Sequence, residues 1–572
     1  MARFHRIPAF AALLALALIA LPALPAAAAN IIINNVDAPG VGFNDPTPVA
    51  PIGGNTGVTL GEQRLIAFQF AADIWGGTLD SDVDIVVQAT FQPLNCTPTS
   101  GTLGSAGTIQ IFSDFPGAPL AGHWYHSALA NKLAGFDLTP GPPDPGLLQP
   151  PFNDDIVAFF NGAVNNDPNC LGGANWYYGL DNNPGADIDF LNVLTHELGH
   201  GLGFANFISE DTGAGPLGLP DVYSSFTHDN TQGLNWNVMT DAQRQLSAVN
   251  TGNVVWDGAN VTTKAPEFLG PRPVLTIHSP ASIAGNYEAQ TAAFGAPLTT
   301  AGVTGDVVLV DDGTGTPSDG CEPIANAAQV AGNIALIDRG TCAFTIKVAN
   351  AEAAGAVAAI VANNVAGGPA PMGGTDPNIT ISSVGITLAA GNAIKGELPG
   401  VNATMKLDAS LLAGGDDNGR VRLYAPAVVA LGSSISHFDT VATPNLLMEP
   451  FINADLAAAT STDLTPYLLE DEGWMLLDSD GDGFPNIEDA CVDSDLSPTV
   501  VIDGCNSHAA NVLVDQGCSV SDLVGACGDS ASNHGQFVAC TAQLTFSLWR
   551  DHTISLRDKV RILICAAFAD IP

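Results

Sequence analysis

The stretch His196-Glu-Leu-Gly-His200, followed by Gly203, decides how this chain is interpreted. Residues four apart lie on one face of an α-helix, so the two imidazoles can bind one metal ion. Glu197 lies about 100° around the helix from His196, where its carboxylate can accept a proton from water beside a zinc ion. The opposite face carries the leucines at positions 191, 194, 198 and 202. This spacing predicts a helix over residues 187–203 with a buried back and a functional front.

The first 29 residues have the composition of a secretory signal peptide. Arg3 and Arg6 precede an apolar run at 9–21, and four alanines at 26–29 follow it. We expect cleavage between Ala29 and Asn30. No later stretch reaches about 18 apolar residues. The sequence therefore predicts a secreted, extracellular or periplasmic chain with no membrane contact after cleavage.

The composition is strongly acidic. Asp and Glu number 58 against 17 Lys and Arg, a formal net charge of −41. This balance argues against nucleic acid or an anionic membrane as a partner. Only 13% of residues are charged, and the 61 glycines and 39 prolines favour short strands and loops. The length predicts about three or four domains. The oligomeric state stays open.

Ten cysteines in an exported chain predict disulfides. Proximity within domains favours the pairs Cys96–Cys170 and Cys321–Cys342. The other six lie between Cys491 and Cys565, where fifteen connectivities are possible.

The chain divides by pattern into a split catalytic domain and three further modules. Residues 30–270 combine a helical pattern at 61–75 with strands at 84–91 and 156–160 and then the His196 helix, which predicts an α+β domain. Residues 271–412 show a strand–helix–strand order typical of a small α/β domain. Residues 413–477 return to the first domain and end in a predicted closing helix over 465–477. A calcium loop is expected at 478–495 and a cysteine-rich, helical module at 496–572.

The His196 motif resembles that of the metzincin metallopeptidases, H-E-x-x-H-x-x-G-x-x-H/D followed by a methionine turn. The third-ligand position of that pattern falls on Asn206, a poor zinc ligand. A catalytic zinc needs three protein ligands and one open position, so the third must come from elsewhere. His437, with the stretch Asn445-Leu-Leu-Met448-Glu-Pro450 behind it, resembles the leishmanolysin-like branch, in which an insertion precedes the third histidine.

By that resemblance His437 completes a zinc site with His196 and His200, and Met448 lies beneath the ion. Two other candidates for the third ligand remain open, Asp221 and His228.

Residues 271–412 resemble a protease-associated (PA) domain. The resemblance rests on Gly332–Gly340 (GNIALIDRG), Cys342-Ala-Phe344, the stretch at 350–355, Asn363-Asn364 and the stretch at 372–376. PA domains carry no catalytic residues. An inserted PA domain accounts for the distance between Gly203 and His437, because insertions are tolerated where the chain ends lie close together.

The stretch 478–489 matches a calcium loop. Its oxygen ligands are expected from Asp478, Asp480, Asp482, Asn486 and Asp489, with Gly483 at the sharp turn. The cysteine at 491 makes it similar to a thrombospondin type 3 repeat.

Together these resemblances imply a zinc-dependent endopeptidase that acts on proteins or peptides, with Glu197 as general base and calcium as a second ion. The alternative is an exported, non-catalytic binding or surface protein with a degenerate metal site, in which the PA and calcium modules do the binding. The intact Glu197 favours the enzyme, since a structural zinc site does not need it.

Overall fold

The structure is a computed structural model that describes residues 27–138 and 154–571. It divides into a unit of residues 28–476 and a unit that contains 477–572. The predicted signal peptide lies outside the described residues up to residue 26. Ala29, the last residue of the predicted signal, is buried, and its amide donates to the carbonyls of Gly76 (3.1 Å) and Leu79 (3.0 Å).

A four-stranded sheet in the order β1-β3-β7-β4 forms the platform of the larger unit. Strands β1 (Ile31–Asn35), β3 (Ile85–Gln92) and β7 (Ile156–Asn161) are parallel, and β4 (Gly104–Thr108) is antiparallel to β7 at one edge. Every second residue of β3, from Ile85 to Phe91, is buried, as expected for a strand with one face in the core.

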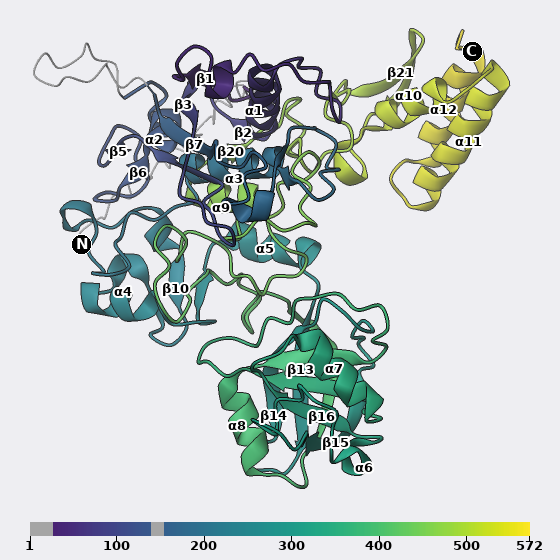
Figure 1. Ribbon diagram of the computed structural model, residues 1–572. Coiled ribbons are helices and arrows are strands. Elements are labelled where there is room, and N and C mark those ends of the chain that lie inside the picture. Colours follow the sequence, from purple (N-terminus) through teal and green to yellow (C-terminus); the bar gives the residue numbers. More distant parts are fainter. Residues whose placement is uncertain (1–26, 139–153, 572) are drawn as a thin grey trace, which may run out of the picture. The chain divides into compact units, whose positions relative to one another are not determined.

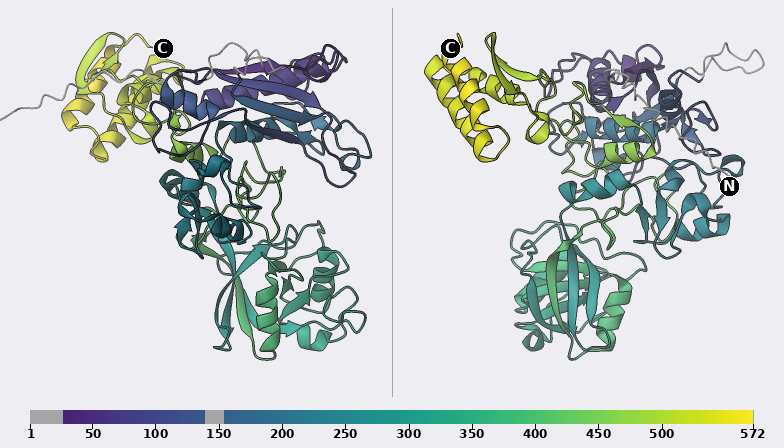
Figure 2. Two further views of the ribbon diagram at one scale, coloured as in Figure 1. Left: turned by 90° about the vertical axis from the view of Figure 1, so that its left-hand side faces the viewer. Right: turned by 180° about the vertical axis from the view of Figure 1, so that it is seen from behind.

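Helices α1 (Leu60–Gly76) and α3 (Phe190–Leu202) pack against each other and onto the sheet (Figures 1 and 2). A capping box at Thr59 and Glu62 starts α1. The Trp75 indole N–H donates to the Thr195 carbonyl at 3.0 Å and so joins the two helices. The predictions at 61–75, 84–91, 156–160 and 187–203 thus agree with α1, β3, β7 and α3 to within a few residues.

Short elements complete this unit. The helices are α2 (Ser127–Ala134), α4 (Asp241–Ser247), α5 (Ala259–Phe268) and α9 (Thr465–Glu472), and the strands are β2 (Leu79–Asp80), β5 (Ile111–Phe112), β6 (Tyr125–His126), β8 (Trp176–Tyr177), β9 (Ile188–Asp189), β10 (Thr227–Asp229), β11 (Leu234–Asn235), β12 (Val254–Trp256) and β20 (Met475–Leu476). The predicted closing helix over 465–477 is too long. Helix α9 ends at Gly473, whose φ of 123° a helix cannot continue, and residues 475–476 instead pair with β2.

Residues 271–412 form a closed barrel in the order β13-β14-β18-β17-β16-β15-β19. Its strands are β13 (Pro271–Ser279), β14 (Gly285–Thr291), β15 (Val303–Leu309), β16 (Ile334–Asp338), β17 (Ala358–Ala362), β18 (Ser382–Ile386) and β19 (Asn402–Leu412), and its helices are α6 (Ala327–Val330), α7 (Phe344–Ala353) and α8 (Leu388–Gly396). The predicted strand–helix–strand order is present as β16-α7-β17, but the sheet closes because β13 and β19 pair antiparallel.

That pairing also fixes how the barrel is attached. The first residue of β13 pairs with the last residue of β19, Pro271 with Leu412. The Ala413 amide donates to the Gly270 carbonyl at 2.8 Å, so the chain leaves where it entered. The barrel has apolar cores of its own. Residues 413–476 then return to the core that holds α1 and α3.

The smaller unit contains the hairpin β21 (Thr499–Ile502) and β22 (Cys505–Ala510) and the helices α10 (Val520–Asp529), α11 (His534–Arg550) and α12 (Leu556–Phe568). The cysteine-rich module is thus helical as predicted, with a hairpin that the sequence pattern did not predict. All ten cysteines form disulfides. Cys96–Cys170 and Cys321–Cys342 pair as predicted, and the last six join as Cys491–Cys518, Cys505–Cys565 and Cys527–Cys540. Within the described residues, no helix is both long and apolar enough to cross a bilayer.

Candidate metal centre

Helix α3 carries the first part of the site. Its N-cap residue Asp189 accepts hydrogen bonds from the amides of Leu191 (2.9 Å) and Asn192 (3.4 Å). It ends at Gly203, whose φ is 158° and whose Cβ, if present, would lie 2.4 Å from the Glu472 carboxylate. Gly203 is therefore required by space as well as by the backbone. All four leucines of the predicted back face are fully buried.

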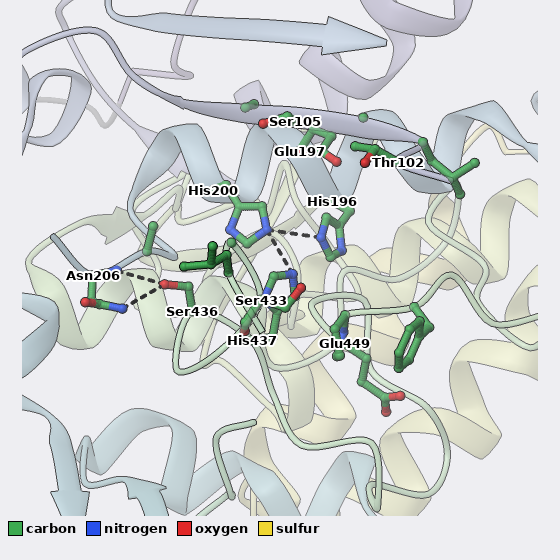
Figure 3. Close-up of a pocket in the computed structure, with 18 of the residues that line it drawn as sticks. Thr102, Ser105, His196, Glu197, His200, Asn206, Ser433, Ser436, His437 and Glu449 are labelled. Carbon is green, nitrogen blue, oxygen red and sulfur yellow. Dashed lines mark hydrogen bonds between the residues drawn. The ribbon is translucent and has the colours of Figure 1, made fainter. Parts of the chain in front are cut away.

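Three histidines converge beside this helix, and they come from two distant parts of the chain. The Nε2 atom of His200 lies 3.1 Å from that of His196 and 3.2 Å from that of His437 (Figure 3). All three side chains are buried. Two nitrogens bound to zinc at 2.0–2.1 Å with tetrahedral angles are about 3.3 Å apart, so this spacing matches that of zinc ligands.

The other nitrogen of each ring fixes the tautomer. His196 Nδ1 lies 2.7 Å from the Leu447 carbonyl, His200 Nδ1 lies 2.7 Å from the Phe204 carbonyl, and His437 Nδ1 lies 2.8 Å from the Ser433 carbonyl. A carbonyl only accepts, so each Nδ1 carries the proton. Each Nε2 is then unprotonated and carries a free lone pair, and the three lone pairs face one point. Three unprotonated nitrogens cannot form hydrogen bonds with one another, but together they can bind one divalent cation.

Burial also keeps the three rings neutral. It lowers the pKa of His196 to about 4 and that of His200 to about 3, and it holds the pKa of His437 well below its ordinary value. The rings are thus ready to bind a metal at neutral pH, because a metal ligand must be deprotonated.

Met448 lies under the middle of the helix. A Cβ on Gly199, between the two helix histidines, would come within 2.8 Å of the Met448 sulfur, so the methionine packs directly on that turn. The Met448 carbonyl accepts from the Phe438 amide at 2.9 Å, next to His437. The segment 446–448 therefore supports both groups of ligands, and Met448 packs rather than binds.

Glu197 occupies the same cavity as the histidines. Burial raises the pKa of its carboxyl to about 8, although the Ala106 amide on β4 donates to it. A Cβ on Gly104 would lie 2.8 Å from the Glu197 Oε1, so the glycine leaves the space that the carboxylate occupies. Figure 3 shows Glu197 beside Thr102 and Ser105, on the strand side of the histidines.

The cavity around these groups has a volume of about 860 Å³. One wall is the segment 101–106, which includes the start of β4, and the others are 205–210, 431–437 and 449–452. Among the described residues, its lining contains carboxylates and histidines but no lysine or arginine. Because β4 is the last strand of its sheet, its outer edge borders the cavity.

The two other third-ligand candidates lie outside this cluster. Asp221 is fully buried and accepts from the amides of Phe207 (2.6 Å) and Ser224 (2.7 Å). His228, on β10, is held by the Asn235 side chain at 2.6 Å. At this site the ligand atoms that come together are those of His196, His200 and His437.

Asn206, at the position where the metzincin pattern has its third ligand, has a different contact. Its backbone amide and its side-chain amide both donate to the Ser436 hydroxyl, at 3.1 and 3.0 Å. Ser436 immediately precedes His437, so Asn206 connects the end of the helix to the loop that carries the distant histidine (Figure 3). No sequence pattern predicts this contact, since serine and asparagine are common in loops.

The predicted calcium loop brings Asp478, Asp480 and Asp482 together, with ligand oxygens within 4.8 Å of one another. One oxygen each of Asp482 and Asp489 is buried without a hydrogen-bond partner. A Cβ on Gly517 would lie 2.1 Å from Asp489 and 3.0 Å from Asp482, so both carboxylates point toward this glycine. The side-chain oxygen of Asn486 accepts from the Ser479 amide at 2.9 Å, as an oxygen of Asp478 accepts from the Gly481 amide at 2.8 Å, and the role of Asn486 as a ligand stays a prediction.

Comparison with known families identifies one domain. The family model of the PA domain matches residues 303–394, so the chain contains a PA domain within the barrel. Vacuolar-sorting receptor 2 of Arabidopsis thaliana is 32% identical over 158 residues, 25% of each chain. An aminopeptidase of Pseudomonas aeruginosa is 40% identical over 105 residues, 18% of this chain and 17% of that protein. The PRADC1-like protein of Drosophila melanogaster is 53% identical over 45 residues, 8% of this chain and 23% of that protein.

The chain therefore spans about a quarter or less of the length of these curated relatives. Among solved structures, the zinc aminopeptidase BSAP of Bacillus subtilis is 26% identical with a TM-score of 0.20, over 26% of this chain and 36% of that one. The subtilisin-like protease Apa1 of Pseudoalteromonas is 22% identical with a TM-score of 0.19, over 25% of this chain and 34% of that one.

Proposed function

We propose that this protein is a zinc-dependent endopeptidase of the metzincin type, with the leishmanolysin-like arrangement in which the third ligand follows an insertion. The observation that carries the proposal is the convergence of three unprotonated Nε2 atoms beside a buried carboxylate. His196, His200 and His437 hold the ion, and Glu197 is the general base. A structural zinc site usually has four protein ligands and needs no adjacent base.

The chain's own residues divide the chemistry as follows. Zinc, when bound, acidifies a water molecule and polarises the substrate carbonyl. A bound dication would oppose the effect of burial and favour the ionised form of Glu197. Its carboxylate then accepts the proton of the attacking water and later donates it to the departing amine. The Ala106 N–H donates to this carboxylate and so favours its ionised form. The three backbone carbonyls at Nδ1 hold the imidazoles in the tautomer that binds the metal.

The outer edge of β4 is the feature that favours an extended peptide as the substrate. An unpaired strand edge can add a substrate strand through main-chain hydrogen bonds. Because the segment 101–106 runs along the cavity past Glu197, such a peptide would continue on both sides of the bond to be cleaved. This geometry favours an endopeptidase over an enzyme that removes terminal residues.

The location and the second ion complete the proposal. Five disulfides fit an oxidising compartment and support a secreted or periplasmic protein. The unpartnered oxygens of Asp482 and Asp489 support a calcium ion bound by the loop at 478–489, similar to a thrombospondin type 3 repeat.

The proposal is tested by Glu197→Gln. Zinc content measured by mass spectrometry is expected to stay at that of the wild type, because Glu197 is not a ligand. Hydrolysis of casein is expected to fall by about 10²–10⁴, the usual contribution of a general base. The control is Glu267→Gln, a 60% exposed carboxylate on α5, which should change neither quantity.

Two results would contradict the proposal. Wild-type hydrolysis by Glu197→Gln would remove the base from the mechanism. A wild-type protein that binds zinc but cleaves neither casein nor gelatin would favour the non-catalytic alternative, in which the PA and calcium modules carry the function.

A further inference from the structure

Residues 477–571 have an apolar face that none of the described residues of their unit covers. On α12, Leu556, Val560, Ile564 and Phe568 are 56, 49, 52 and 85% exposed. They recur every four residues and therefore lie along one side of the helix. The neighbouring helix α11 adds Phe546 (49% exposed) and Trp549 (36%). We call these six residues the hairpin face, after the helical hairpin of α11 and α12 and not the β21–β22 hairpin. Figure 1 shows α11 and α12 side by side.

This face is not the unit's core. The core uses the other side of α12, where Ile562, Cys565 and Ala566 are buried and Cys565 is bonded to Cys505. A soluble protein seldom exposes a continuous apolar stripe of this length unless it is a site of interaction.

Opposite charges mark the two ends of α12. The four lysines and arginines of residues 477–572, Arg550, Arg557, Lys559 and Arg561, all lie at the α11–α12 connection and in the first half of α12. They outnumber the two acidic residues of that end, Asp551 and Asp558, which pair with Arg550 and Arg561. The other end is acidic. The Asp570 amide donates to Asp503 at 2.7 Å, and Asp503 and Asp529 line one groove with Ile571. The helix dipole adds to this polarity, positive at Leu556 and negative at Phe568.

A helix with one apolar side and ends of opposite charge is complementary to itself when reversed. We propose that a second copy of this chain covers the hairpin face, with the two α12 helices antiparallel across a two-fold axis. The apolar stripes then face each other, and the basic end of each α12 meets the acidic end of the other. A parallel pairing would place like charges together. The two-fold axis closes the assembly at a dimer.

Lys559 shows how the basic end adapts to an apolar interface. Its Nζ lies 4.5 Å from the centre of the Phe546 ring and 5.1 Å from that of Trp549. The ammonium is thus held against the aromatic surface and does not need to leave when the face is covered.

The first experiment measures the mass of the full-length protein by sedimentation equilibrium at about 50 µM, where a small interface of moderate affinity is populated. The expected mass is that of a dimer. Ile564→Glu should raise the dissociation constant by at least about tenfold, because it places a charge in the centre of the interface. The control Leu217→Glu, an 89% exposed residue of the other unit, should remain dimeric.

The second experiment tests the antiparallel arrangement. Arg557→Asp and Asp570→Arg should each weaken the dimer about threefold, the scale of an exposed ion pair. Equal amounts of the two single variants should form a mixed dimer of wild-type affinity, because every cross-pair then joins opposite charges. The double variant should also recover.

A monomer at all concentrations would overturn the proposal and assign the face to another part of this chain or to a different partner. A dimer that Ile564→Glu leaves intact, or charge variants that do not complement each other, would overturn it equally. None of these readouts depends on zinc or on hydrolysis.

Discussion

At the scale of single residues, the candidate site is defined by backbone carbonyls as much as by histidines. The Nδ1 partners come from Phe204, Ser433 and Leu447, three separate segments of the chain. Each segment fixes one ring, so the three Nε2 atoms are directed to one point before a metal arrives. Groups that hydrogen-bond to metal ligands usually orient those ligands in this way. Removing such a group usually lowers metal affinity by about 10–100-fold.

The contact between Asn206 and Ser436 leads to a prediction about the third ligand. His437→Ala should lower zinc affinity by at least about a hundredfold, whereas Asp221→Asn should retain the metal. Adding Asn206→His to His437→Ala should recover part of the affinity, because residue 206 lies beside the loop that carried the lost imidazole. Competition with a chromogenic chelator measures all three.

The control is Asn206→Ala in the His437→Ala background, which should recover nothing. Loss of zinc in Asp221→Asn with retention in His437→Ala would transfer the ligand to Asp221.

The sequence predicts such a site unevenly. His196, Glu197 and His200 are within one turn of each other, so helical spacing alone brings them together. His437 is 237 positions from His200, and only the resemblance to a family with an insertion predicts it as the third ligand. The Asn206–Ser436 contact was beyond prediction, because it depends on where the inserted barrel returns the chain.

At the scale of elements, β4 is a strand that its amino-acid composition does not predict. Its sequence, Gly-Ser-Ala-Gly-Thr, lacks the branched and aromatic residues that predict a strand. It forms because five consecutive residues pair antiparallel with β7. The glycine that weakens the pattern is the one whose missing side chain makes room for Glu197.

Gly104→Val tests that relation. The new side chain would overlap the Glu197 carboxylate, so we expect at least a tenfold loss of kcat/KM with zinc content unchanged. The matched control is Gly107→Val on the same strand, where a Cβ meets no atom within 4 Å. Equal activity in the two variants would show that β4 does not determine where Glu197 lies.

The loop at 478–489 is an element whose order should depend on an ion. Calcium at about a hundredfold excess over its dissociation constant should stabilise the protein by about 2.7 kcal/mol, seen as a rise in Tm of the transition of this unit. Asp489→Asn should abolish the rise, because this carboxylate has a buried, unpartnered oxygen. The nearby exposed Asp493→Asn should keep it. A calcium response that survives in Asp489→Asn would place the ion elsewhere.

At the scale of the whole molecule, the inserted barrel explains how distant segments meet. Strands β13 and β19 are neighbours, so the inserted stretch of about 140 residues begins and ends at adjacent points, and the core that holds α1 and α3 remains continuous. The sequence predicted the insertion from the PA resemblance and the two local disulfides from spacing. Barrel closure and the pairing of the last six cysteines depend on long-range contacts that no local pattern encodes.

The same core contains a carboxyl group that should make stability depend on pH. Both oxygens of Glu472 are buried without a hydrogen-bond partner, and burial raises its pKa well above the ordinary 4.5. A raised folded-state pKa stabilises the fold below the unfolded value, and this contribution is lost as the pH rises toward the folded value. Glu472→Gln should therefore raise Tm more at about pH 8 than at about pH 5.

Thermal melts in chelator, which remove any shift caused by zinc, measure this difference. The exposed Glu267→Gln should show no such pH dependence. A shift of equal size at both pH values would mean that the folded-state pKa of Glu472 is not raised above its unfolded value.

The central claim is that His437 completes a zinc site with the two histidines of α3. Anomalous difference maps collected on either side of the zinc absorption edge test it most directly. We predict one peak about 2.0–2.1 Å from the Nε2 atoms of His196, His200 and His437. A peak bound to Asp221 or His228 instead, with the His437 ring turned away from the ion, would contradict the account.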